Sequence, residues 1–421
     1  MKRLVLFAAA LFLAPWLQAA PPNIVFIVSD DHCWTDYGFM GHPQVQTPCL
    51  DKLASQSLTF RRGYVPSSLC CPSLAAIITG LYPHQNKITC NDPPGPPPSK
   101  KRTPQEQTAF TEGREVMTRH LEAVPTLPRL LAKQGYLSLQ TGKWWQGDYH
   151  RGGFTHGMTK GQRHGDEGLD IGRKTMQPIY DFIATARKEN KPWFVWYAPM
   201  MPHDPHTPPQ HFLDKYTSKT DSIHVARYWA MVEWFDETCG QLLDHLDKQG
   251  LADNTIVLYV TDNGWVAGPD GRPTRSKLTP YDAGLRTPIM VRWPGKIKPR
   301  MSDDLAMSID LVPTVLAALG LKPTPAMQGV NLMDAKAVAA RKTIFGECFV
   351  HTAIDLNNPS KNLEQRWIVD GAWKLIVPQN NSETELYNLA ADPHEETNLA
   401  SKEARKVNAL KRKLDAWWKP E

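Results

Sequence analysis

The stretch Asn23–Ser29 reads NIVFIVS, an uninterrupted apolar run rich in β-branched residues, and it ends directly before Asp30 and Asp31. A run of this length and composition predicts a strand that is buried on both faces, as in a parallel sheet. The same pattern recurs at residues 192–197 (PWFVWY) and at residues 255–260 (TIVLYV). The sequence therefore predicts three buried strands of one sheet.

Helical patterns separate these strands, and the alternation predicts a doubly wound α/β fold. They lie at residues 50–57, 74–79, 127–134, 179–188 and 223–249. In such folds ligands bind at the carboxyl edge of the strands. Polar residues follow each of the three strands: Asp30 and Asp31, then His203, then Asp262 and Asn263. We therefore expect these side chains to share one cleft.

The first residues have the order of a secretory signal peptide. A basic pair at residues 2–3 precedes an apolar run at residues 4–13, and Ala19 and Ala20 follow. This order predicts a signal peptide over residues 1–20, and the apolar run is too short to span a bilayer. A retained membrane anchor is the alternative. We expect a periplasmic or secreted protein with no stable membrane insertion.

The charge of the chain is small for its 421 residues, because the formal net charge is +5 and basic and acidic residues are interspersed. This balance does not indicate a nucleic-acid-binding protein, although it suits an anionic substrate. The length allows one large α/β domain with an appendage, or two to three ordinary domains.

The character of the sequence changes near residue 342, where short strand-like pieces such as residues 366–369 and 373–377 replace the long buried runs. A final amphipathic helix places four apolar residues on one face: Val407, Leu410, Leu414 and Trp417. We therefore predict a main catalytic domain over residues 21–341 and a small C-terminal α+β subdomain over residues 342–421.

Seven cysteines in an exported chain would ordinarily indicate disulfides with one thiol left over. Their spacing shows no zinc-binding pair of the CxxC kind. The adjacent Cys70 and Cys71 are unusual, because neighbouring cysteines rarely bridge each other without strain. One of the two is a candidate for a thiol that is free for a chemical reason.

Carboxylate and amide side chains at two strand ends suggest a metal site. Taken separately, Asp30 and Asp31 could cap a turn, and the Asp262-Asn263-Gly264 segment has the chemistry of a turn. Together they offer hard oxygen ligands, which suit calcium or magnesium rather than a soft metal.

The segment Cys70-Cys71-Pro72-Ser73-Leu74, which continues as AAIITGLYPH, resembles the signature of the type I sulfatases. The resemblance implies that a formylglycine-generating maturation enzyme oxidises Cys70 to formylglycine. One hydroxyl of the hydrated aldehyde would then attack sulfur, and the other would later expel sulfate, which a thiolate could not do. A structural buried thiol is the alternative for Cys70.

Further segments resemble the same family along nearly the whole chain. They imply calcium ligands at Asp30, Asp31, Cys70, Asp262 and Asn263. The Thr141-Gly142-Lys143-Trp144 segment, and Lys277 ahead of residues 281–288, imply two lysines that bind sulfate. The Pro202-His203-Asp204-Pro205 segment implies a histidine near the leaving oxygen, which could act as general acid or bind sulfate. Cys70, Lys143, His203 and Lys277 are thus the candidate catalytic residues.

This resemblance implies an alkaline phosphatase/sulfatase-like fold, with a large doubly wound mixed sheet sandwiched by helices. It implies an exported, calcium-dependent sulfatase with a sulfated glycan as substrate. The chain departs from the family at Leu74, where the motif has arginine, and at Trp145, where it has histidine. Two alternatives remain: a phosphate or phosphonate ester hydrolase of the same fold, and a catalytically silent carbohydrate-binding relative.

Overall fold

The computed structural model describes residues 20–96, 100–380 and 382–421. Nearly all of the expected signal peptide therefore lies outside the described residues. Within the described ranges, no helix is both long enough and apolar enough to cross a membrane.

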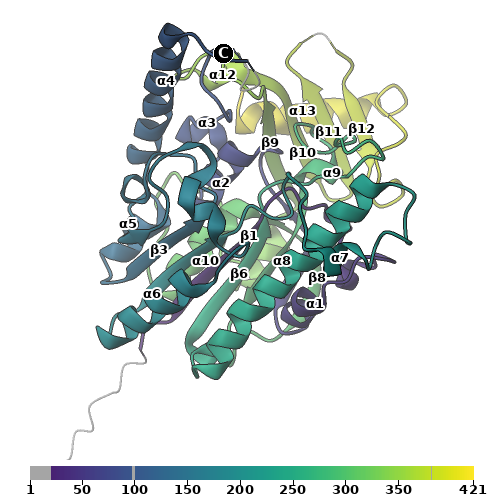
Figure 1. Cartoon of the computed structure of the whole chain (residues 1–421). Helices are drawn as coiled ribbons and strands as arrows, with labels where there is room; N and C mark the ends of the chain where they lie inside the picture. The colour runs from purple at the N-terminus through teal and green to yellow at the C-terminus, as the bar shows by residue number, and fades with distance from the viewer. Residues whose placement is uncertain (1–19, 97–99, 381) are drawn as a thin grey trace, which may run out of the picture.

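The main sheet has eight strands in the order β4-β3-β5-β1-β6-β7-β2-β8 (Figure 1). Its strands are β1 (Asn23–Ser29), β2 (Leu58–Tyr64), β3 (Leu137–Gly142), β4 (His156–Gly157), β5 (Trp193–Ala198), β6 (Thr255–Thr261), β7 (Arg286–Arg292) and β8 (Arg300–Met307). All neighbouring pairs are parallel except those of β7, which runs antiparallel to β6 and β2. The expected mixed, doubly wound sheet is confirmed.

The three strands expected from the apolar runs are the central neighbours β5, β1 and β6. Ile24 pairs with Phe194 of β5 on one side and with Ile256 of β6 on the other. This register brings the three carboxyl ends together, so that Asp30 forms a bridge with Pro202 beyond β5.

Both faces of the sheet are covered, which explains the uninterrupted apolar runs. In β1, Ile24 and Phe26 lie in one buried cluster while Val25 and Ile27 lie in the other, because successive side chains of a strand point to opposite faces. The first cluster includes side chains of α2 (Cys70–Thr79), α5 (Leu127–Ala132) and α10 (Leu311–Ala318). The second includes those of α1 (Pro48–Ser55), α6 (Gln177–Lys188) and α8 (Ile223–Lys248). The ribbons of these helices are labelled in Figure 1.

The α-helices are α1 (Pro48–Ser55), α2 (Cys70–Thr79), α3 (Pro83–Asn86), α4 (Pro104–Glu122), α5 (Leu127–Ala132), α6 (Gln177–Lys188), α7 (Gln210–Leu213), α8 (Ile223–Lys248), α9 (Asp282–Leu285), α10 (Leu311–Ala318), α11 (Ala335–Ala340), α12 (Pro359–Asn362) and α13 (Ala404–Trp417). The five expected helical segments correspond to α1, α2, α5, α6 and α8. We expected a helix from Leu74, but α2 already begins at Cys70. Cys70 therefore lies in the first turn of the helix rather than before it.

A second, antiparallel sheet forms the C-terminal part, in the order β12-β11-β10-β9. Its strands are β9 (Thr343–Phe349), β10 (Leu363–Asp370), β11 (Trp373–Pro378) and β12 (Glu385–Asn388). The expected apolar face of the last helix is confirmed, since Leu410 and Leu414 of α13 are buried in one cluster with side chains of β10, β11 and β12. The proposed domain boundary at residue 342 stays a prediction.

The cysteines do not form the disulfides that export would ordinarily suggest, because all seven are free. Six of them are buried, and Cys49 is partly buried.

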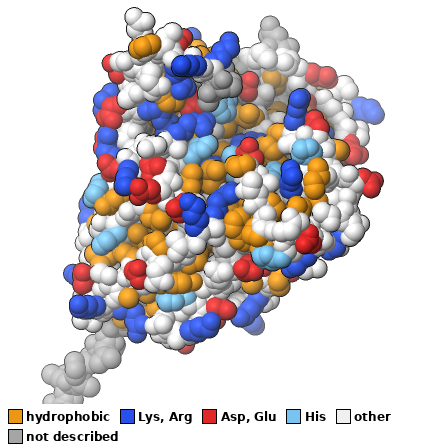
Figure 2. Space-filling view, in the orientation of Figure 1, with side chains coloured by type: hydrophobic (Ala, Val, Ile, Leu, Met, Phe, Trp, Pro, Cys, Tyr) orange, Lys and Arg blue, Asp and Glu red, His pale blue; other side chains and the backbone are white. Residues whose placement is uncertain are grey.

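On the face shown in Figure 2, basic and acidic side chains are interspersed, in keeping with the small net charge.

A buried ion cluster joins the C-terminal sheet to the main sheet. The Nζ atom of Lys374 on β11 lies 2.8 Å from Asp282 Oδ1 at the start of α9 and 2.8 Å from Glu395 Oε1. The Tyr64 hydroxyl donates a hydrogen bond to Asp282 Oδ2 at 2.9 Å. Because all of these side chains are buried, each charge depends on its partners.

Replacing Lys374 with Met should lower the free energy of unfolding by about 3–5 kcal/mol, because two buried carboxyl groups lose their cation. Urea unfolding measures the loss. Lys413→Met is the matched control, since Lys413 is half exposed in its ion pair with Asp370. That change should cost less than about 1 kcal/mol. Equal losses in the two variants would contradict the role of Lys374.

Candidate active site

The expected site residues converge at the carboxyl edge of the main sheet. Four of its strands, β1, β3, β5 and β6, deliver polar residues there. The ligand atoms of Asp30, Asp31, Cys70 and His203 all lie within 4.8 Å of one another. The structure therefore brings the ends of β1 and β5 and the start of α2 to one point.

The second pair of expected metal ligands joins this group through hydrogen bonds. Asn263 Nδ2 donates to Asp31 Oδ1 at 2.6 Å, and the Asp31 backbone N–H donates to Asp262 Oδ1 at 3.2 Å. Asp31 has a positive φ of 59°, an uncommon conformation for a residue other than glycine. The buried His32 ring supports this turn, because it hydrogen-bonds Ser29 Oγ and the Asp36 carbonyl.

Two lysines, the buried Lys143 and the partly buried Lys277, face the carboxylates. Lys143 Nζ lies 2.5 Å from Asp30 Oδ2 and 3.7 Å from Asp262 Oδ2. Lys277 Nζ lies 2.7 Å from Asp31 Oδ1. Burial alone would lower the pKa of Lys143, but the negative charges of Asp30, Cys70 and Asp262 together outweigh burial and raise that pKa. Both lysines therefore remain cations next to Cys70.

His203 is the third cation of the cluster. Its Nε2 atom lies 3.4 Å from Asp31 Oδ2, and its Nδ1 atom lies 2.8 Å from Asp204 Oδ1. Burial lowers the pKa of His203, but the attraction of Asp31 and Asp30 together outweighs burial and raises the pKa to about 10. His203 thus holds a proton at neutral pH, as a general acid must.

The adjacent thiols of Cys70 and Cys71 have different surroundings. Burial raises the pKa of Cys70, but Lys143 and Lys277 outweigh burial and hold that pKa at about 7. Burial raises the pKa of Cys71 to about 12, and its sulfur accepts a hydrogen bond from Gln146 Nε2 at 3.0 Å. Of the two, only Cys70 belongs to the charged cluster.

Three oxygen atoms of this cluster have no hydrogen-bonding partner within the described part of the chain: Asp30 Oδ1, Asp262 Oδ2 and Asn263 Oδ1. An unpaired buried oxygen is costly, and three together provide free ligand positions for a cation. All three are hard donors of the kind that calcium prefers. The expected metal ligands therefore fit a calcium ion.

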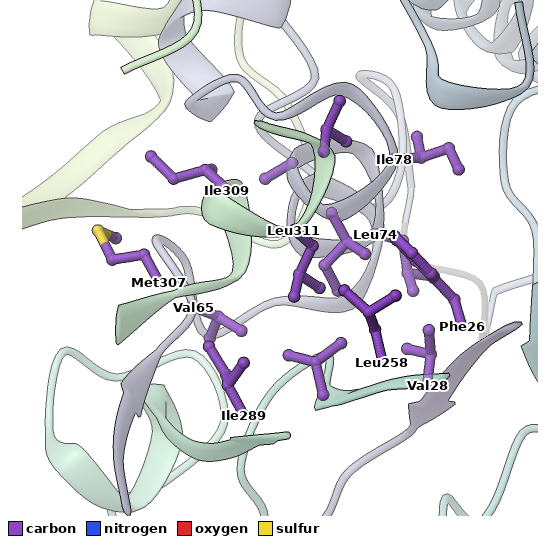
Figure 3. Close-up of a cluster of buried hydrophobic side chains, with 14 of the residues drawn as sticks. Phe26, Val28, Val65, Leu74, Ile78, Leu258, Ile289, Met307, Ile309 and Leu311 are labelled. Carbon is purple, nitrogen blue, oxygen red and sulfur yellow. The ribbon is translucent and has the colours of Figure 1, made fainter. Parts of the chain in front are cut away.

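Both departures from the resembling motif are buried. Leu74 is packed in the first apolar cluster with Phe26, Val28 and Leu258 (Figure 3). Trp145 is 1% exposed, and the guanidinium groups of Arg114 and Arg163 lie 5.3 Å and 4.8 Å from its ring. Both side chains are therefore enclosed by their neighbours.

Two residues of the motif segments, Trp144 and His84, have structural surroundings. Trp144 packs edge-on against Trp196 in the core, with ring centroids 6.2 Å apart. His84 pairs with Glu347 at 2.8 Å and stacks on Trp418 near the C-terminus. His84 is thus occupied away from the charged cluster.

Sequence patterns missed several residues that support the site. The Arg173 guanidinium donates to the backbone carbonyls of Met200 and His203, and so holds the loop that carries His203. His164 lies beside His203, with ring centroids 5.9 Å apart. Neither residue belongs to a spacing motif, so only their three-dimensional placement reveals them.

Two family models and several known proteins match most of this chain. The family model described as "Sulfatase" matches residues 22–321, and one described as "N-sulphoglucosamine sulphohydrolase, C-terminal" matches residues 276–419. Arylsulfatase A of Homo sapiens is 30% identical over 377 residues, which cover 77% of this chain and 68% of the relative. N-acetylgalactosamine-6-sulfatase of Mus musculus is 30% identical over 367 residues, covering 76% and 67%.

A solved structure supports the fold. It holds a protein in complex with its substrate D-glucosamine-2-N,6-O-disulfate, and it matches this chain with a TM-score of 0.73 and 21% identity. The match covers 94% of this chain and 97% of the other. At this identity the likeness shows the shared fold alone.

In metal-free protein with an unmodified Cys70, we expect one thiol to titrate near pH 7, where the lysines place its pKa. The ultraviolet absorbance of the thiolate measures this titration. Cys70→Ser should remove it, and Lys143→Met should raise its midpoint because a stabilising cation is lost. Cys71→Ser is the matched control and should leave it unchanged. A titration near pH 7 that persists in Cys70→Ser would contradict the assignment.

Proposed function

The chain belongs to the sulfatase family and is a sulfuric ester hydrolase, and from that premise we propose that it is exported and releases sulfate from a sulfated carbohydrate. We propose that it uses a calcium ion and a formylglycine formed from Cys70. The names of the mouse relative and of the ligand in the solved neighbour support a sugar substrate. The order of charge, apolar core and small residues before Pro21 supports export to the periplasm or medium.

One observation carries this proposal: Cys70 lies among three cations, of which Lys143 and His203 are buried and Lys277 is partly buried. A tetrahedral dianionic or monoanionic group is the ligand that such a set of donors suits. Because water is excluded around the lysines, each donor acts more strongly than it would in solution.

The proposed calcium ligands are Asp30, Asp31, modified Cys70, Asp262 and Asn263. The unpaired oxygens of Asp30, Asp262 and Asn263 support this set. When bound, calcium would polarise sulfate oxygens and offset the charge of the carboxylates. It would also weaken the hold of Asp30 and Asp31 on the two lysines, since those carboxylates would then face a stronger cation.

We propose that Cys70 is the residue that the maturation enzyme converts, and that Cys71 is structural. The hydrated aldehyde supplies a nucleophilic hydroxyl group that a thiol lacks. The position of Cys70 supports this assignment, because it lies in the first turn of α2, where backbone N–H groups and the helix dipole favour an anion. Cys71 instead contacts Gln146 and Asn91.

The remaining residues of the cluster bind the sulfate group and supply a proton. Lys143 and Lys277 donate hydrogen bonds to sulfate oxygens and stabilise the charge that develops on them, and losing either donor should cost about 2.7–4 kcal/mol in the barrier. His203 carries the proton that the leaving sugar oxygen needs when the ester bond breaks. Arg173 positions His203 through the backbone of its loop.

A sulfate-release screen over defined sulfated saccharides, with phosphate and phosphonate esters as comparators, tests the proposed function. Matured wild-type protein should release sulfate from at least one saccharide. Cys70→Ala should abolish release while the folded protein keeps a weaker calcium response through the four remaining ligands, and Cys71→Ser should keep substantial activity. Mass spectrometry of the fragment that bears Cys70 should show formylglycine. An active sample with an unmodified Cys70, or release of phosphate alone, would contradict the proposal.

Calcium should raise the melting temperature in a concentration-dependent way, because a ligand that binds only the folded state stabilises it by mass action. At one hundred times the dissociation constant the gain is about 2.7 kcal/mol. Differential scanning calorimetry of demetallated protein measures this gain. Asp262→Ala should abolish it, whereas Asp303→Ala, a change at an exposed carboxylate paired with Arg61, should not. A full calcium response in Asp262→Ala would place the ion elsewhere.

A further inference from the structure

The segment η3 (Arg163–Asp170) is fixed to the end of β3 that carries Lys143. The Trp144 backbone N–H donates to the His164 carbonyl at 3.0 Å. Gly165 and Gly168 both lie against the Gly142 carbonyl, so closely that a Cβ atom would stand 2.4 Å and 2.6 Å from that oxygen. The backbone of η3 therefore has little freedom relative to Lys143.

His164 adopts an unusual backbone conformation within this segment. Its φ is 71° and its ψ is −19°, in a region that side chains other than glycine and asparagine rarely adopt. Asp166, two residues further on, makes this turn rigid. Its carboxylate accepts hydrogen bonds from the backbone N–H groups of Lys160, Gln162 and Glu167. Such conformations persist where the surroundings impose them, and they concentrate at functional sites.

The contacts of His164 fix which ring nitrogen carries the proton. The Arg163 guanidinium forms two hydrogen bonds with the Asp92 carboxylate, at 2.9 Å and 3.0 Å. Its Nη1 atom also lies 2.7 Å from His164 Nε2. Since arginine can only donate, Nε2 must accept, and the proton of the neutral ring sits on Nδ1.

The Nδ1–H group is available for a ligand. In the described ranges it has no hydrogen-bonding partner, and the side chain is only partly buried. Burial, together with the nearby charges of Lys143 and Arg163, lowers the pKa of His164, which keeps the ring neutral. The ring therefore offers one neutral donor at the cleft.

The ring lies at the wall of the charged cluster. Its centroid is 5.9 Å from that of His203 and 4.5 Å from the ring of Trp145. Lys143, Lys277 and His203 are all near enough to act on its charge. His164 thus adds a donor next to three cations, on a rigid segment that no spacing motif indicated.

We propose that His164 is a substrate-binding residue whose Nδ1–H group donates a hydrogen bond to the sulfate group held by Lys143, Lys277 and His203. This inference rests on the proposed function. Arg163 is a positioning residue, because it holds the ring in the required tautomer and is itself held by Asp92. The segment η3 then completes the binding site from outside the strand ends that supply the other donors.

Two variants separate the donor from the backbone conformation. His164→Asn keeps a donor near the position of Nδ1 and tolerates a positive φ, whereas His164→Gly suits the backbone and removes the donor. His156→Ala is the matched control, since His156 is a partly buried histidine on the edge strand β4. That control should stay within about twofold of wild type.

Steady-state turnover and calorimetric binding of inorganic sulfate test the proposal in matured, calcium-loaded protein. His164→Gly should lower kcat/KM by about 10²–10³-fold. It should weaken sulfate binding by about 10- to 100-fold, and His164→Asn should recover most of both losses. Wild-type turnover and affinity in His164→Gly would overturn the proposal. Equal losses in both variants with a lowered melting temperature would also overturn it, because they indicate a purely structural role.

The two measurements distinguish this inference from the proposed function. If the wild type binds inorganic sulfate but cleaves no sulfate ester, the proposed function fails, and the affinities of the two variants still decide the role of His164. If the wild type cleaves a sulfate ester and His164→Gly keeps wild-type turnover, the proposed function stands and the role of His164 is wrong.

Discussion

Three carboxyl groups, those of Asp30, Asp31 and Asp262, are buried together at the carboxyl edge of the main sheet, each at most 3% exposed. Burying charge in this way is costly unless cations and hydrogen bonds compensate for it. Lys143, Lys277 and His203 provide this compensation, and the charge of these three cations is in turn held in place by the carboxylates. The rest of the site depends on this mutual compensation of charge.

The main sheet brings these oppositely charged side chains together. Because β5, β1 and β6 are adjacent and parallel, His203, Asp31 and Asp262 emerge at the same edge without a long loop. Lys143 follows from β3, the next strand outward. The apolar clusters on both faces hold these strands, and Leu74 belongs to that support rather than to the cleft. Helix α2 thus contributes to both the site and the core, because it places Cys70 in the charged cluster and Leu74 in the apolar cluster.

The central strands and most of the charged cluster could be predicted from the sequence. Each long apolar run indicates a buried strand, and the polar residues at its end indicate the site. Other elements lack such a signal. Strand β8 is largely exposed in its first half and contains two aspartates, and α4 has few buried side chains on its nineteen residues. The contacts of His164, Arg163 and Asp92 join segments about seventy residues apart, so no local spacing reveals them.

The most direct test of the shared charge cluster is a crystal structure of the matured protein with calcium and an uncleaved sulfated saccharide. Our account predicts an ion coordinated by Asp30 Oδ1, Asp262 Oδ2 and Asn263 Oδ1 at about 2.3–2.6 Å. It also predicts Lys143 and Lys277 in contact with the sulfate oxygens, and the modified Cys70 facing sulfur. A structure in which calcium lies elsewhere, and in which both lysines keep their pairs with Asp30 and Asp31 while sulfate is bound, would contradict it.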